Sequence, residues 1–202
     1  MPPVVVETNW VLDVTLHQNE ASEDLLRFAR AGHVELLLPS FCIAEAVKNF
    51  ESKQNRWKTL EDAISREKEE ALRGELLQFV DGPLTVAANT LAELADQAET
   101  EFWDRLAEIT GVAKVVEPTP AVIHRTMEIR QLLGLDPADA AVLATVVEMR
   151  LQGIADVFVS RDTDFGDEPV RAYIADQNIT YHGSALPITG PLTGAHGPSR
   201  QL

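Results

Sequence analysis

The sequence predicts a three-layer α/β/α sandwich with a central parallel sheet of four to five strands. Two observations predict this fold class. Short apolar runs rich in Val and Leu, without polar alternation, are typical of strands that are covered on both faces. Segments with helical spacing of apolar residues separate these runs, as the connections between parallel strands require.

The elements follow one another in order from the N-terminus. The first strand is "VVVE" at 4–7, an amphipathic helix at 23–32 ends on a glycine, and the second strand is "VELLLPS" at 34–40. The next helix, 41–51, takes Ser40 as its N-cap. The remaining elements are helices at 120–134 and 137–153, and strands at 113–118, 156–160 and 179–183.

The expected domain organisation is one domain over residues 1–183. Within it, apolar residues at helical spacing predict a helical-hairpin insertion at 57–110, which turns at Gly82-Pro83. Residues 184–202 are rich in Gly, Pro and Ser and are expected to be a flexible tail.

Composition restricts the compartment and the partners. A single cysteine, Cys42, cannot form a disulfide within the chain, which favours a reducing cytoplasm. We expect no membrane association, because no apolar run approaches the roughly 20 residues of a membrane span and no signal-peptide pattern is seen. The net charge of −15 argues against broad, nonspecific nucleic-acid binding, although a small basic track remains compatible with it.

Carboxylates follow the predicted strands at one edge of the sheet, where open α/β folds bind ligands. They are Glu7 after the first strand, Glu45 in the helix after the second, Asp139 in the helix before the fourth, and Asp162 and Asp164 after the fourth. Two bare carboxylates about 4 Å apart repel each other by roughly 4 kcal/mol, so a group of them needs protons or a multivalent cation. Oxygen ligands without His or Cys indicate Mg²⁺ or Mn²⁺.

Structural roles for the same residues remain open. Asp136 fits an N-cap before Pro137, and Asp139 then also fits a first-turn acid that the helix dipole favours. Glu45 could face solvent, and aspartates after a strand often shape a turn. Polar neighbours that could orient the carboxylates are Thr8, Asn9 and Ser160.

The segments "VVVETN", "PSFCIAEA", "DPADAAVLATV" and "FVSRDTDF" together resemble the PIN domain, the fold of many bacterial toxin ribonucleases and of several RNA-processing nucleases. Order and spacing match from residue 4 to about 182. The resemblance assigns the family's four acidic positions to Glu7, Glu45, Asp139 and Asp162. The family has Asp where this chain has Glu7, and the extra methylene bears on efficiency and metal preference.

The resemblance implies an endoribonuclease that depends on Mg²⁺ or Mn²⁺ and hydrolyses single-stranded RNA. These four carboxylates would be its catalytic residues, with Asp164 as a further metal ligand. It also allows a toxin with an antitoxin partner, a stand-alone RNA-processing enzyme and a homodimer.

Two other classes of function stay open. A PIN-like RNA- or protein-binding module with a weakened metal site is favoured by Glu7. A receiver-type signalling domain also gathers carboxylates at this edge, but it should carry a lysine after the last strand, and "ITYHG" has none.

A basic segment, "KNFESKQNRWKT" at 48–59, is the candidate for RNA contact. Its members are Lys48, Lys53, Arg56, Trp57 and Lys58. Cations around an aromatic ring that can stack on a base suit single-stranded RNA. Packing of Trp57 against the hairpin explains the same pattern equally well.

Overall fold

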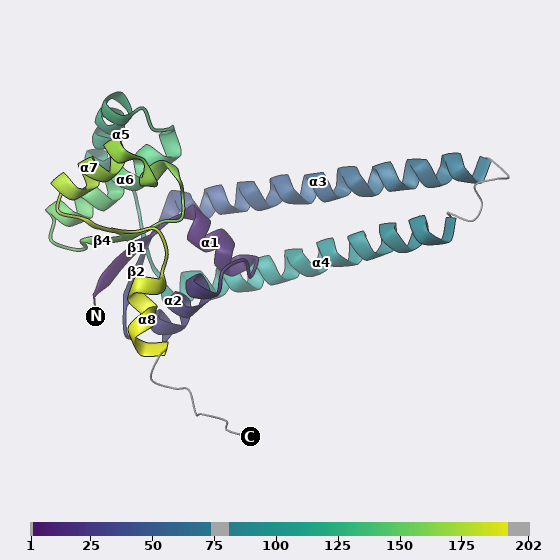
Figure 1. The fold of residues 1–202 in the computed structure, drawn as a ribbon, viewed down its shortest axis with the longest axis horizontal. Helices are drawn as coiled ribbons and strands as arrows, with labels where there is room; N and C mark the ends of the chain where they lie inside the picture. Colours follow the sequence, from purple (N-terminus) through teal and green to yellow (C-terminus); the bar gives the residue numbers. More distant parts are fainter. Residues whose placement is uncertain (1, 74–80, 194–202) are drawn as a thin grey trace, which may run out of the picture. The chain divides into compact units, whose positions relative to one another are not determined.

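The structure is a computed structural model that describes residues 2–73 and 81–193 (Figure 1). It contains two compact units. One consists of Met1–Ala46 with Arg105–Leu202, and the other of Val47–Asp104. The first unit contains the sheet and the predicted acidic residues. We describe each unit by itself.

The sheet has five parallel strands in the order β3-β2-β1-β4-β5. The strands are β1 (Pro3–Val6), β2 (Glu35–Pro39), β3 (Lys114–Val116), β4 (Val157–Val159) and β5 (Thr180–His182). In the central strand, Val5 pairs with Leu37 on β2 and with Phe158 on β4, and all three side chains are buried. Helices flank the sheet, so the predicted α/β/α fold class is confirmed.

The helices of this unit divide into two groups. Figure 1 shows α5 (Pro120–Leu133) and α6 (Pro137–Leu151) together beyond one side of the strands, where they pack on each other. On the other side, α2 (Glu20–Arg30) packs on α1 (Thr8–Thr15) and on α8 (Leu186–Thr193). A 3₁₀ turn, η2 (Asp164–Gly166), leads into α7 (Glu168–Asp176).

Two helix starts follow the expected signals. Asp136 is the N-cap of α6, accepting hydrogen bonds at Oδ1 from the backbone N–H groups of Ala138 (2.7 Å) and Asp139 (3.1 Å), and Pro137 occupies the first turn. Thr119 caps α5 in the same way before Pro120. Proline suits this place because the first-turn N–H has no partner within the helix.

Two segments differ from the sequence prediction. Helix α1 begins directly after the β1 strand end, where the sequence predicted no helix. Part of the predicted tail is also ordered: Leu186–Thr193 form α8, because buried Ala185 and Thr189 anchor this segment. Residues 194–202 of that tail lie outside the described residues.

The second unit pairs parts of two long helices, α3 (Ser40–Arg73) and α4 (Asp81–Val112). The Phe50 and Phe102 rings stack with centroids 4.1 Å apart near one end, and Lys68 Nζ lies 3.5 Å from Asp81 Oδ1 near the other. This antiparallel pair agrees with the predicted hairpin, although the compact unit spans Val47–Asp104 rather than 57–110.

The predicted turn at Gly82-Pro83 is wrong. Both residues lie in the first turn of α4, where a proline costs no helical hydrogen bond. The connection between the two helices, residues 74–80, lies outside the described residues. No helix in the described part of the chain is both long and apolar enough to cross a membrane.

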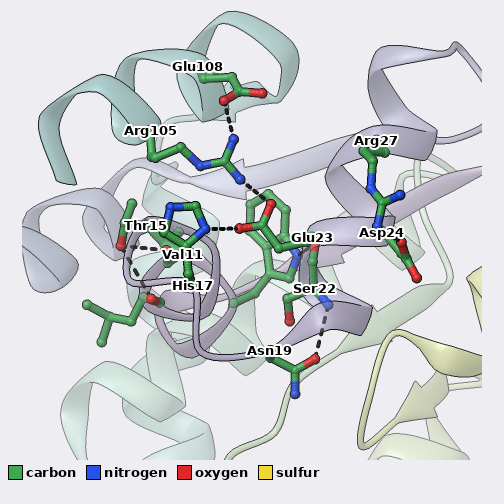
Figure 2. Close-up of polar contacts among 12 residues, drawn as sticks. Val11, Thr15, His17, Asn19, Ser22, Glu23, Asp24, Arg27, Arg105 and Glu108 are labelled. Carbon is green, nitrogen blue, oxygen red and sulfur yellow. Dashed lines mark hydrogen bonds and ion pairs between the residues drawn. The ribbon is translucent and has the colours of Figure 1, made fainter. Parts of the chain in front are cut away.

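Ion pairs connect α2 with the last turns of α4 inside the first unit (Figure 2). Glu23 binds His17 Nδ1 at 2.9 Å and also pairs with Arg105. Arg105 pairs in addition with Glu108, which pairs with Arg30. We call these five residues the Glu23 network. Each of its carboxylates contacts at least one basic side chain.

Candidate active site

Glu7 lies at the end of β1 and is the N-cap of α1. Its Oε2 accepts a hydrogen bond from the backbone N–H of Asn9 (2.6 Å), and its Oε1 accepts one from Ser160 Oγ (3.1 Å). Only 4% of Glu7 is exposed. Glu7 is therefore buried rather than exposed to solvent, and it caps α1.

Asp162 lies beside Glu7 because β4 is adjacent to β1 in the sheet. Ser160 links the two acids, since its hydroxyl donates to Glu7 and accepts from the backbone N–H of Asp162 (2.9 Å). Asn9 Nδ2 donates to Asp162 Oδ2 at 3.1 Å, and the N–H of Asp164 donates to Asp162 Oδ1 at 3.0 Å. Asp162 thus shapes the turn after β4 while its carboxylate faces the start of α1.

Glu45 reaches the same place from the first turns of α3. The Thr8 hydroxyl donates to Glu45 Oε2 at 2.6 Å, which ties this carboxylate to the residue directly after Glu7. Cys42 lies one turn before Glu45 and is fully buried. Burial raises the pKa of the Cys42 thiol to about 12, as expected of a core residue rather than a nucleophile.

Electrostatic repulsion shows that the acidic side chains lie close together. Burial raises the pKa of Glu7 to about 8, the charges of Asp162 and Asp139 add to this rise, and the hydrogen bonds from Asn9 and Ser160 oppose it. Burial also raises the pKa of Asp139 to about 7. The nearby charges that add to the rise for Asp139 come from Asp136, Asp162, Asp164 and Glu45.

These contacts define an acid cluster, by which we mean Glu7, Glu45, Asp139, Asp162 and Asp164. Glu7 is buried, the next three are half-buried, and Asp164 is exposed. Within the described residues, no basic side chain is among the main causes of the pKa shifts of Glu7 and Asp139. Glu7 and Asp139 therefore keep their protons to a higher pH than ordinary carboxyl groups do when no metal is bound.

The chemistry of the cluster fits a hard divalent cation, because every donor is a carboxylate oxygen and the repelling charges favour an added positive charge. The positions of these side chains do not form a complete ligand set. In residues 2–73 and 81–193, no three His, Cys, Asp or Glu side chains are arranged closely enough to hold one ion.

Residues that sequence analysis did not single out also border the cluster. The Tyr181 hydroxyl donates to the Ser160 carbonyl at 3.1 Å, and burial, followed by the charges of Asp162 and Glu7, raises its pKa. Arg161, between Ser160 and Asp162 in the chain, pairs with Asp13 on α1. Only the strand order, which places β5 next to β4, brings Tyr181 here, and no sequence motif marks it.

The basic segment lies on α3 in the second unit. Lys48, Arg56 and Lys58 are exposed, whereas Lys53 and Trp57 are half-buried. The Trp57 ring meets Phe50 edge-on, with centroids 6.3 Å apart and an interplanar angle of 80°. Trp57 thus packs within its unit, as one of the two interpretations expected, and the cations remain open to solvent.

Comparison with known proteins identifies the family. The PIN-domain family model matches residues 4–165, so the chain belongs to the PIN-domain family, whose members are generally nucleases that use divalent metals. Among solved structures, the chain is similar to VapBC2 from Rickettsia felis, bound to a DNA fragment from their promoter, at 11% identity. That match covers 90% of this chain and 98% of the other, with a TM-score of 0.48. No curated protein matches.

Proposed function

We propose that this PIN-domain chain is a divalent-metal-dependent endoribonuclease that hydrolyses phosphodiester bonds of single-stranded RNA. The observation that carries the proposal is the acid cluster, in which burial and mutual repulsion raise the pKa of Glu7 to about 8 and that of Asp139 to about 7. Carboxylates without a cation of their own are suited to receive one. The RNA preference rests on the family resemblance alone.

Four carboxylates would hold Mg²⁺ or Mn²⁺ in this proposal: Glu7, Glu45, Asp139 and Asp162, with Asp164 as a further ligand. Since no three of them surround one point in the described residues, binding would require small side-chain rotations. When bound, the ion lowers the pKa of a water molecule and stabilises the leaving oxygen of the phosphodiester. The carboxylates contribute by releasing their protons and fixing the position of the ion.

Three polar side chains would orient these ligands. Thr8 holds Glu45, Asn9 holds Asp162, and Ser160 holds both Glu7 and Asp162. Each of these bonds limits the rotamers available to its carboxylate.

The proposal extends to the substrate surface. Lys48, Lys53, Arg56 and Lys58 would contact RNA phosphates, with Trp57 as a neighbouring aromatic. Replacing Lys53, Arg56 and Lys58 by Ala should weaken RNA binding and reduce the log–log salt slope by roughly two, since each lost phosphate contact removes about 0.7. An unchanged affinity and slope would leave the segment with a packing role only.

The biological setting is part of the same proposal. We propose residues 1–183 as the nuclease domain, with the helical hairpin inserted in it, and a cytoplasmic toxin of a toxin–antitoxin pair as the role, with an antitoxin as partner. A homodimer is compatible with it. Copurification with the product of the neighbouring gene tests the partner.

One observation favours a second candidate, a PIN-like RNA- or protein-binding module without activity. The cluster contains Glu7 where the family has Asp, and no three of its members form a ligand set in the described residues. A binding module should bind RNA equally well in EDTA and in Mg²⁺, and should never cleave it.

Asp162→Asn tests the nuclease proposal. Asn keeps an oxygen for the Asp164 N–H but loses the negative charge, which relieves repulsion in the metal-free cluster and removes an anionic ligand. The variant should melt at or above wild type in EDTA, gain little stability from Mg²⁺ and no longer cleave single-stranded RNA. The exposed Asp176→Asn on α7 is the matched control and should behave like wild type. A variant that unfolds easily in EDTA but still cleaves RNA would refute the assignment.

A further inference from the structure

Arg161 is a basic residue next to the acid cluster in the chain, between Ser160 and Asp162. Its guanidinium nevertheless binds elsewhere. Arg161 Nη1 lies 2.7 Å from both Oδ1 and Oδ2 of Asp13, a residue of α1. The side chain of Arg161 is 44% exposed, so packing alone does not hold it in this direction.

Asp13 is held in place by contacts that do not involve Arg161. It is 5% exposed, and Ser22 Oγ on α2 donates to its Oδ2 at 3.0 Å. Ser22 is fixed in turn, because its backbone N–H donates to the N-cap residue Asn19 at 3.1 Å (Figure 2) and its carbonyl accepts from Trp10 Nε1 at 3.2 Å. Asp13 is thus a buried anion on a rigid helix pair, and Arg161 is its cation.

The direction of Arg161 has an electrostatic consequence. Its guanidinium pairs with Asp13, and within the described residues no hydrogen bond or ion pair joins it to a carboxylate of the acid cluster. Arginine has a long, flexible stem. Without Asp13, the acid cluster, to which the neighbouring residue Asp162 belongs, would attract Arg161, and an internal cation there competes with an external one.

We propose that Asp13 is a positioning residue that holds Arg161 away from the acid cluster and so keeps the cluster open for a divalent cation. This role rests on the proposed function. Asp13 contacts no acid-cluster residue in the described hydrogen bonds and ion pairs, so it acts through Arg161 alone. Removing the arginine should therefore cancel the effect of removing the aspartate.

The test is a double-mutant cycle on the full chain, with Mn²⁺ affinity measured by isothermal titration calorimetry. Asp13→Asn should weaken Mn²⁺ binding about tenfold, the equivalent of one displaced charge interaction of about 1.4 kcal/mol. Arg161→Gln should bind Mn²⁺ as tightly as wild type or more tightly. The double variant should bind like Arg161→Gln. Asp24→Asn, which removes a carboxylate paired with Arg27 on α2, is the control and should leave the affinity unchanged.

The possible results distinguish a failure of the positioning role of Asp13 from a failure of the proposed function. A double variant as weak as Asp13→Asn would show a purely structural effect and overturn the positioning role, as would weaker Mn²⁺ binding by Arg161→Gln. Mn²⁺ binding by Arg161→Gln can be measured even if the Asp13 variants do not fold. A wild-type chain that binds Mn²⁺ while Asp13→Asn binds it equally well overturns this role alone. A wild-type chain that binds no Mn²⁺ overturns the proposed function and the role with it.

Discussion

Two groups of acidic residues in the same compact unit show opposite electrostatics. In the Glu23 network, Glu23 pairs with His17 and Arg105, and Glu108 pairs with Arg105 and Arg30 (Figure 2). In the acid cluster, the hydrogen bonds to the carboxylates come from hydroxyls and amides, and two of the carboxyl groups have raised pKa values. One group balances its charges within the chain, and the other does not.

The difference indicates that the two groups of acidic residues have different roles. A balanced network contributes to the stability of the fold whether or not a divalent cation is present. An unbalanced, half-buried cluster costs stability until protons or a cation neutralise it. Asp13 and Arg161 support this distinction, because the available arginine next to the cluster is bound outside it.

The largest contrast is expected for Asp139→Asn. Loss of this charge removes repulsion from the metal-free cluster and one anionic ligand from the bound state. Stability in EDTA should stay the same or rise, while RNA cleavage should fall more than about 100-fold, because a metal ligand supports several kcal/mol of transition-state stabilisation. Thermal melts and cleavage rates measure both effects.

Asp136→Asn is the matched control for this prediction. It lies three residues earlier on the same helix, and Asn caps a helix as well as Asp. Stability should remain near wild type, and cleavage should change far less than in Asp139→Asn, because only the repulsion of Asp136 on Asp139 is lost. Equal losses of activity in the two variants would mean that α6 tolerates no change in this turn and would remove the distinction between ligand and cap.

The next largest effect is expected in the pH dependence of the unfolding free energy. Glu7 has an ordinary pKa of 4.5 when unfolded and about 8 when folded, and for Asp139 the values are 3.8 and about 7. The folded state therefore holds these protons more tightly, and the stability they provide is complete below about pH 4 and lost as the pH rises to 8. In EDTA, unfolding free energy should fall over this range by on the order of a few kcal/mol.

Urea melts at several pH values measure this dependence, and Glu7→Gln provides the check. Its amide cannot ionise, so the decline between pH 5 and 8 should become shallower. A wild-type stability that rises across this range in EDTA would contradict the raised pKa values.

Arg105→Gln tests the balanced group. The variant leaves Glu23 and Glu108 without the guanidinium that they share. The Arg105 side chain is only 20% exposed, so its loss should lower the free energy of unfolding by about 1–3 kcal/mol. The loss should be the same in EDTA and in Mn²⁺, and cleavage at a temperature where the variant is folded should match wild type. A loss of stability that depends on Mn²⁺ would show that the Glu23 network is coupled to the acid cluster, and the contrast between the two groups would then be wrong.

The smallest effect is expected for Glu7→Asp. The shorter side chain is a better N-cap and still reaches the Asn9 N–H, but it withdraws from Ser160. It also restores the ligand length of the family. Cleavage activity should be at or above the wild-type level, measured with the same RNA and metal. A loss as large as that of Asp139→Asn would show that this site is built around glutamate.

The sequence was sufficient for features that depend on local composition. Apolar runs marked the central strands. Glu7 and Asp162 after these strands, and Asp139 in the helix before the fourth strand, were expected at one edge of the sheet because parallel strand ends meet there. Asp136 was predicted as a cap from Pro137 alone. These inferences need only the periodicity of each segment and the topology of the fold.

Features that depend on distant partners were not predictable. Arg161 and Asp13 are 148 residues apart, and nothing in either segment indicates their pairing. The length of α3 and α4 depends on packing within the second unit, whereas the place of Pro83 in the first turn of α4 follows from the local preference of proline for that position. Helix α8 depends on burial against α2, which its Gly- and Pro-rich sequence does not suggest.

The most direct test of the central claim is the melting temperature of the wild-type chain in Mn²⁺ and in EDTA at matched ionic strength. If the acid cluster is a metal site, the ion must stabilise the folded state, by about 2.7 kcal/mol at 100 times its dissociation constant. We expect a higher melting temperature in Mn²⁺, with a shift that grows as the pH rises towards 8 because fewer protons then compete. Identical melting curves in Mn²⁺ and EDTA at pH 8 would contradict the account.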